Sequence, residues 1–188
     1  TRFILLVLLV AALGHIVTSA SLKIPPFKYL HRNWNTRHGL PQNSVYCMQR
    51  DALGNLWIGT GRGVVRFDGL KFETFDDSGL ASINTYQATS LLLSRKDEIW
   101  IGTYGGGAVR FSDNRFIYYS NLTGMPNDFV LCITEGMNRE IWMGTQGGGL
   151  LKFIDGRFNT FTTASGLAHN TVNALLTDTR SVIWIGTS

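Results

Sequence analysis

Short apolar runs, separated by turns rich in Gly, Asp and Asn, fill most of this chain. The first group of runs covers Val45–Arg50, Leu56–Thr60, Val64–Phe67 and Lys71–Phe75. Runs of this length that are rich in β-branched and aromatic residues are typical of β-strands. Gly and Asn at the intervening turns supply the positive φ that tight hairpins require. The pattern therefore predicts a unit of four short antiparallel strands.

The same unit recurs along the chain. Trp57-Ile58-Gly59-Thr60 returns at Trp100, Trp142 and Trp184, with spacings of 43, 42 and 42 residues. A period of about 40–45 residues with four strands per unit is the signature of a β-propeller blade. We therefore predict an all-β fold, a β-propeller of four-stranded antiparallel blades. The blades cover about 43–76, 83–119 and 128–161, with a partial blade at 170–187.

An aromatic pair closes each unit, as in Phe72 and Phe75 or Phe116 and Tyr119. Residues three apart on a strand point to opposite faces of the sheet. A sheet buried on one side only would leave one ring of each pair exposed. We therefore expect each blade to be packed between two neighbours, with the aromatic repeat in the core.

The N-terminal region differs from the repeats. Residues 3–13 are almost entirely apolar and are followed by the small residues Thr18-Ser19-Ala20. This pattern predicts a signal peptide at 1–20, with an uncleaved signal anchor as the alternative. Residues 21–28 are a predicted linker, and the repeats occupy 29–188. Tyr29–Thr36 is a predicted outer strand of a further, incomplete blade that would close the ring.

The repeat resembles a known family. The matching segments are Gly39–Val45, Asp51–Asn55, Leu56–Thr60 and Val65–Gly69, and together they closely resemble the two-component-regulator propeller repeat. The resemblance extends over residues 29–188. It implies an extracytoplasmic sensor region of a bacterial membrane signalling protein. Such regions precede a membrane helix and then a histidine kinase, often a hybrid kinase, or alternatively a diguanylate cyclase.

The resemblance also implies the surroundings of the chain. The expected location is periplasmic, with the parent protein anchored in the bacterial inner membrane. The expected partners are an oligosaccharide or another small ligand, and the remaining blades, membrane helix and output domain of the same chain. The resemblance also allows a homodimer of the full-length protein. The fragment itself is expected not to be an enzyme, since it contains neither a phosphoacceptor His in a helical context nor a nucleotide-binding glycine box.

Charge, glycine runs, cysteines and histidines limit the kinds of ligand and cofactor that the chain is expected to bind. A formal charge of +4 is carried by dispersed Lys and Arg residues, which argues against a nucleic-acid partner. The Gly runs at 105–107 and 147–149 link strands and do not open a helix, so a phosphate cradle is not expected. Cys47 and Cys132 fall on the first strands of blades one and three, with a blade between them, and are predicted to be free. No His grouping has metal-ligand spacing, so neither a metal nor a cofactor is predicted.

The loops before each first strand are the best candidates for ligand recognition, because successive blades present equivalent positions there. Amides beside exposed aromatic rings would suit sugar hydroxyls. The alternative is that Asn and Asp only cap the turns through their own backbone. The candidates are Gln42, Asn43, Tyr86, Asn127, Asp128, His169 and Asn170, with Tyr86 in the variant stretch Ser82–Tyr86.

Two other function classes remain open. A secreted propeller enzyme acting on carbohydrate would need two carboxylates at a suitable separation in the channel. Asp51, Asp68 and Asp155 all fall at turns, which argues against this. A secreted scaffold without signalling output is the other alternative.

Overall fold

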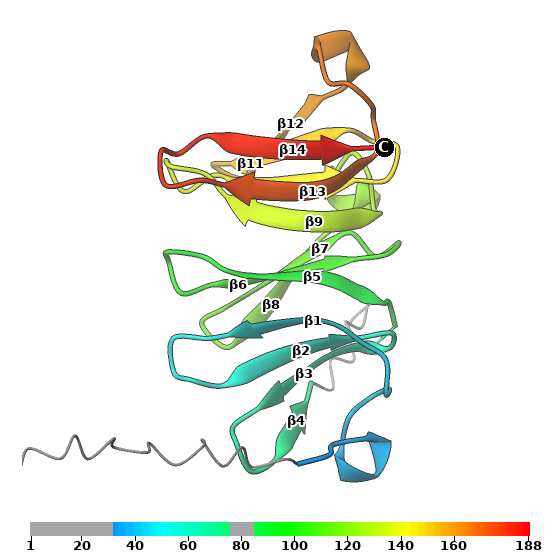
Figure 1. Cartoon of the computed structure of the whole chain (residues 1–188), viewed down its shortest axis with the longest axis vertical. Coiled ribbons are helices and arrows are strands. Elements are labelled where there is room, and N and C mark those ends of the chain that lie inside the picture. Colours follow the sequence, from blue (N-terminus) through cyan, green and yellow to red (C-terminus); the bar gives the residue numbers. More distant parts are fainter. Residues whose placement is uncertain (1–31, 76–84) are drawn as a thin grey trace, which may run out of the picture. The chain divides into compact units, whose positions relative to one another are not determined.

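A computed structural model describes residues 32–75 and 85–188. Three four-stranded antiparallel sheets and one two-stranded sheet make up the compact unit Trp34–Ser188 (Figure 1). Each sheet follows chain order, so within a sheet consecutive strands are hydrogen-bonded to each other. The prediction of an all-β fold built from four-stranded propeller blades is confirmed, and no sheet closes on itself within the described ranges.

The strands fall where the repeat places them. Blade one contains β1 Val45–Arg50, β2 Leu56–Thr60, β3 Gly63–Phe67 and β4 Phe72–Thr74. Blades two and three repeat this order, and the two-stranded sheet holds the first two strands of blade four. These strands are β5 Ala88–Leu93, β6 Ile99–Thr103, β7 Ala108–Ser112, β8 Arg115–Tyr119, β9 Val130–Glu135, β10 Ile141–Thr145, β11 Leu150–Ile154, β12 Arg157–Phe161, β13 Val172–Thr177 and β14 Ile183–Thr187.

The aromatic pairs lie on opposite faces of their blades, as predicted. Phe75 packs on Phe111 and Phe116 of blade two, with ring centroids 5.8 and 5.0 Å away. Phe72 lies on the other side of blade one, in a cluster with Leu40, Ile58 and Val65. Tyr119 and Phe116 divide in the same way between the two faces of blade two. The core therefore lies between blades and not within a single sheet.

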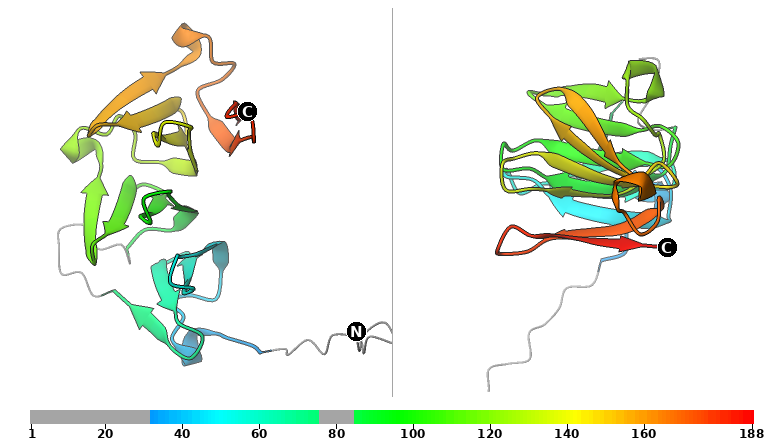
Figure 2. Two further views of the ribbon diagram at one scale, coloured as in Figure 1. Left: turned by 90° about the vertical axis from the view of Figure 1, so that its left-hand side faces the viewer. Right: turned by 90° about the horizontal axis from the view of Figure 1, so that it is seen from above.

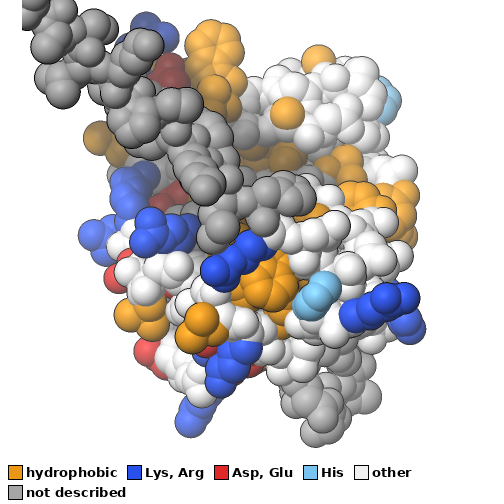
Figure 3. Space-filling view, turned by 60° about the horizontal axis from the view of Figure 1, so that its bottom comes forward, with side chains coloured by type: hydrophobic (Ala, Val, Ile, Leu, Met, Phe, Trp, Pro, Cys, Tyr) orange, Lys and Arg blue, Asp and Glu red, His pale blue; other side chains and the backbone are white. Residues whose placement is uncertain are grey.

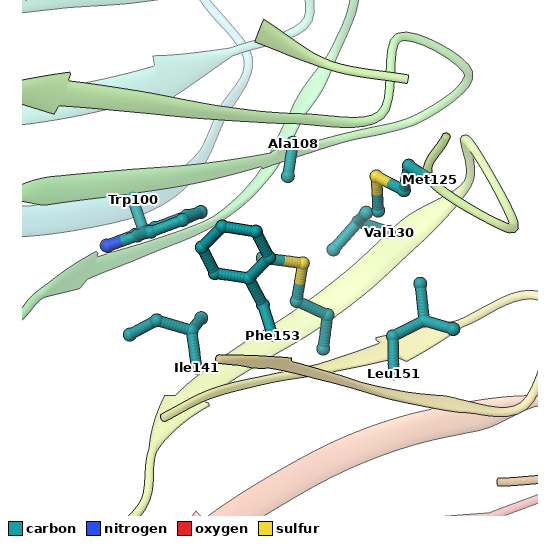
Figure 4. Packing of buried hydrophobic residues seen from close by; sticks show 8 residues of the cluster. Trp100, Ala108, Met125, Val130, Ile141, Leu151 and Phe153 are labelled. Atoms are coloured by element: carbon teal, nitrogen blue, oxygen red, sulfur yellow. The ribbon is translucent and has the colours of Figure 1, made fainter. Parts of the chain in front are cut away.

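Figure 4 shows the core between blades two and three. The ring of Trp100 from β6 faces Phe153 from β11, and Ile141 and Leu151 come from the same blade as Phe153. Trp100 is 1% exposed, stacks on Tyr119 at 5.4 Å and meets Phe153 edge-on at 5.3 Å. Trp57 makes the equivalent contacts with Phe75 and Phe111. Full burial of such a side chain contributes about 1.5–3 kcal/mol of favourable transfer free energy.

The inner strands approach one another closely (Figure 2). A Cβ added to Gly59 would overlap the Cys47 sulfur and lie 2.9 Å from the Cβ of Ala88 in the next blade. Gly144 is confined in the same way by Cys132 and by Val172 of blade four. The glycine of the Trp-x-Gly-Thr repeat is therefore required where neighbouring blades meet.

The predicted N-terminal outer strand lies only partly among the described residues, and it stays a prediction. Residues 32–35 form no strand pairing, and Thr36–His38 is a short 3₁₀ turn, η1. A strand needs a hydrogen-bonded partner, and none lies beside these residues in the part of the chain that the structure describes. Trp34 nevertheless packs on Phe67 and Phe72 at 5.1 and 5.5 Å, much as Tyr119 packs on Phe153 and Phe158.

Several predictions lie outside the described residues. The signal segment at 1–20, the linker at 21–28 and Tyr29–Leu30 belong to this group, as do residues 82–84 of the variant stretch. Among the residues that are described, no helix has the length and apolar character needed to cross a membrane.

Candidate recognition rim

The predicted recognition loops meet at one end of the strands, which we call the connector rim. It consists of the turns Thr60–Gly63, Thr103–Gly107 and Thr145–Gly149 and of the connectors that lead into β1, β5, β9 and β13. One backbone hydrogen bond recurs in every blade and joins the residue after the Trp-x-Gly-Thr motif to the connector. The bonds run from the N–H of Gly61, Tyr104, Gln146 and Ser188 to the carbonyls of Ser44, Gln87, Phe129 and Thr171.

Three of the candidate residues cap turns. The side-chain oxygens of Asn43, Asp128 and Asn170 accept hydrogen bonds from Thr36, Asn121 and Thr163 N–H, at 2.9, 2.7 and 2.8 Å. Each donor is the first residue of a 3₁₀ turn: η1, η2 Asn121–Thr123 or η3 Thr163–Ser165. Its acceptor lies seven residues later in the chain. This repeated bond is the turn-capping role that the sequence left open for Asn and Asp.

The residue before each of these caps lies on the connector rim, and two of the three contact a glycine turn. The side chain of Asn127 covers Gly148, where an added Cβ would lie 2.5 Å from the Asn127 Cβ and 2.6 Å from its Nδ2. The Gln42 amide covers Gly61 in the same way. Asn127 also accepts from Phe129 N–H at 2.8 Å, and His169 Nδ1 accepts from Thr171 N–H at 3.0 Å. The Gln42 Oε1 atom is buried without a hydrogen-bond donor.

Tyr86 belongs to an aromatic group that sequence reasoning recognised only in part. Its ring covers Gly106 and lies 3.8 Å from a Cβ placed on Gly105, whose other neighbour is Phe129. Phe129 in turn meets Tyr104 edge-on at 5.1 Å. Tyr104 is 44% exposed and Phe129 is 41% exposed. Tyr86, Tyr104 and Phe129, which we call the rim aromatics, therefore present ring surface to solvent where blades two and three meet.

Tyr104 and Phe129 were missed, although the repeat carried a signal for them. Blades one, three and four have Gly61, Gln146 and Ser188 at the position of Tyr104. An aromatic residue at a position that is otherwise small or polar, and that is not buried, indicates a specific role for the ring. Alignment of the repeats, position by position, would have identified both rings.

No set of three or more His, Cys, Asp or Glu side chains that could hold a metal ion occurs in residues 32–75 and 85–188. Both cysteines are free, and burial raises the pKa of the Cys47 and Cys132 thiols to about 11. On the face seen in Figure 3, Lys and Arg side chains are dispersed among hydrophobic and neutral ones.

Comparison with known proteins identifies the repeats. The family described as Two component regulator propeller matches residues 39–62 and 166–188, which are the connector and first hairpin of blades one and four. Blades one and four thus carry the sequence pattern of the two-component regulator propeller repeat. Histidine kinase P4 of Formosa agariphila is 34% identical over 55 residues, which is 29% of this chain and 4% of that protein.

Solved structures support the same family assignment. The extracellular domain of BT3049 from B. thetaiotaomicron, a protein assigned to the hybrid two-component systems, superposes with a TM-score of 0.68 at 26% identity. The match covers 78% of this chain and 20% of that one. This chain thus spans about a fifth of the length of that extracellular domain.

A second kind of propeller shares the fold alone. Virginiamycin B lyase from Staphylococcus aureus superposes with a TM-score of 0.60 at 14% identity, over 78% of this chain and 50% of the lyase. This likeness shows that the blade architecture is common to sensors and enzymes. Function must therefore be argued from the site.

Proposed function

We propose that this chain is the ligand-recognition part of an extracytoplasmic sensor whose parent protein is a membrane-anchored histidine kinase. Support comes from the two-component regulator propeller match and from the likeness to the extracellular domain of BT3049. The short match to histidine kinase P4 favours a kinase output over a diguanylate cyclase. The partners within the parent would be further blades, a membrane helix and the output domain.

The observation that carries a recognition role is the group of rim aromatics. Large rings that stay 41–44% exposed forgo the free energy that burial would provide, so another role accounts for them better. The Asn127 amide lies beside Phe129, since its Oδ1 accepts from Phe129 N–H at 2.8 Å and its Nδ2 donates to the Gln146 carbonyl at 3.4 Å. Ring faces flanked by amides suit the apolar faces and hydroxyls of a sugar. We therefore propose an oligosaccharide as the ligand class.

Calorimetric titration with a panel of oligosaccharides tests this site. Tyr104→Ala and Phe129→Ala should each weaken binding by about tenfold, because each removes a stacking surface. Leu70→Ala is the control, since Leu70 is 83% exposed at the opposite end of the strands. Equal binding by all three variants would refute the assignment of the rim aromatics.

The output is tested separately on the parent protein. Autophosphorylation of the reconstituted full-length protein should change when a binding oligosaccharide is added, because a ligand shifts the equilibrium between two states only if it binds them with different affinity. If the full-length protein instead synthesised a cyclic dinucleotide, its output domain would be a diguanylate cyclase and not a histidine kinase. Cleavage of the oligosaccharide by the purified propeller would overturn the sensor role in favour of an enzyme.

A further inference from the structure

A cleft lies between blades two and three at the end of the strands opposite the connector rim. Its volume is about 510 Å³. Trp100, Ile141 and Phe153 form its apolar floor, and these are the side chains at the left and centre of Figure 4. The walls come from the β5–β6 turn of blade two and from the β9–β10 and β11–β12 turns of blade three. Two neighbouring blades therefore supply this cleft jointly.

The cleft has more basic than acidic side chains that are not already paired with each other. Glu98 is occupied, because it accepts from Trp100 Nε1 at 3.3 Å and from Arg110 Nη1 at 3.2 Å. Lys96 and Arg139 also line the cleft, and neither forms a salt bridge with any residue that the structure describes. Asp155 is the one remaining carboxylate among the lining residues. Two unpaired cations thus face a single unpaired anion.

The Arg110 guanidinium has donor capacity that the protein does not use. Its centre lies 5.7 Å from the Trp100 ring, and its Nη1 binds Glu98. Its Nε–H is buried and has no acceptor in the described structure. A buried donor without an acceptor costs free energy, so an acceptor arriving from outside would be favoured.

The backbone of Arg139 adopts a conformation that is unfavourable for this residue type. Its φ is 65°, in the left-handed region that disfavours side chains. The same turn position holds Gly54 in blade one, Asp97 in blade two and Ser181 in blade four, with φ of 93°, 59° and 66°. Gly, Asp and Asn suit this conformation better than Arg does. The conformation is set by the hairpin turn in every blade, and in blade three it places an Arg on the wall of the cleft.

We propose that this cleft binds the anionic group of a small ligand, a carboxylate, sulfate or phosphate, between Lys96 and Arg139 and above Arg110. Charge-assisted bonds from Lys and Arg are the strongest that an anion can accept. Lys96 belongs to blade two and Arg139 to blade three, and both line the cleft, so one ligand can contact both. Binding would therefore bridge blades two and three, independently of the rim aromatics.

Titration calorimetry of the purified protein with inorganic phosphate, sulfate and citrate tests the proposal. At least one probe should saturate, and the comparison of citrate with the two inorganic anions distinguishes a carboxylate ligand from the others. Arg139→Gly should weaken that binding by about tenfold, because it removes one charged donor. Since blade one has Gly at this turn, the variant is compatible with the fold.

Two further variants control the charge and the turn. Asp155→Asn should tighten binding several-fold, because it removes the opposing charge from the cleft. Ser181→Gly makes the same turn change in blade four, away from the cleft, and should leave binding unchanged. Tyr104→Ala should also bind the probe normally, which separates this site from the rim. Failure of every probe to saturate, or equal effects of Arg139→Gly and Ser181→Gly, would overturn the proposal.

Discussion

The first hairpin turns of blades one and three hold equivalent tryptophans in different ways. In blade one, Asp51 accepts from Asn55 N–H at 2.8 Å, from Asn55 Nδ2 at 3.0 Å and from Trp57 Nε1 at 3.0 Å. In blade three, Gly136 stands in place of Asp51, and Trp142 Nε1 is buried without an acceptor. The same indole therefore has a partner in one blade and none in the other.

Blade three obtains support from its neighbour instead. Arg95 of blade two donates to the carbonyls of Gly136 at 2.7 Å and Met137 at 3.1 Å, and its N–H donates to Glu135 Oε2 at 2.9 Å. A Cβ on Gly136 would lie 2.5 Å from the Glu140 carboxyl group and 2.8 Å from Trp142 Nε1, so the Glu140 side chain occupies the space beside this glycine. The comparison teaches that a repeat can replace a bond within the turn with a bond between blades.

The largest effect is expected from Asp51→Ala. The substitution removes the acceptor for three donors and leaves the buried Trp57 indole unsatisfied, which should cost about 3 kcal/mol of unfolding free energy. Urea denaturation measures the change. A cost below about 1 kcal/mol would show that water satisfies these donors equally well.

A pair of substitutions tests whether the indole bond distinguishes the two blades. Trp57→Phe should cost about 2 kcal/mol, because it removes both buried ring surface and the donor to Asp51. Trp142→Phe should cost less than about 1 kcal/mol, because it removes a donor that has no acceptor. Equal costs in thermal unfolding would mean that Trp142 Nε1 is satisfied after all.

Arg95→Ala tests the bond between blades. It should destabilise the protein by about 1 kcal/mol, because Arg95 is half exposed and water can replace part of what it donates. Hydrogen exchange should increase at residues 136–139 and stay unchanged at residues 51–55. Exchange that increases equally in both turns would contradict a local role.

Acid pH should weaken the turn of blade one but not that of blade three, which has Gly136 in place of Asp51. Burial opposes ionisation of Asp51, but hydrogen bonds from Asn55, Trp57 and the backbone outweigh it, so its pKa lies below the ordinary 3.8. A lowered folded-state pKa stabilises the protein above pH 3.8, and this stabilisation is lost as the pH falls further. Stability measured between pH 6 and pH 2 should therefore fall less steeply in Asp51→Ala. An unchanged slope would assign acid sensitivity to other carboxylates, such as Asp68 and Asp178, whose pKa values are also lowered by hydrogen bonds.

The fold was largely predictable because the repeat aligns four copies of each position. Val45–Arg50 and Leu56–Thr60 match β1 and β2 residue for residue. The outer strand at Tyr29–Thr36 stays a prediction, since strand formation depends on a partner strand and not on the local pattern alone. The recognition residues were harder to predict. Whether Asn43 caps a turn or faces a ligand depends on its distance from Thr36, which sequence spacing does not contain.

The close approach at Gly59, Gly102 and Gly144 also fixes the curvature of the array. Near the inner strands each blade meets the next through residues as small as Gly, Cys and Ala, while farther out Trp and Phe rings separate the same two sheets. Each interface is thus a wedge, thin on the inside and thick on the outside. The taper sets how far each blade rotates from the last, so one methyl group on these glycines would open the arc and change the number of blades that a ring can hold.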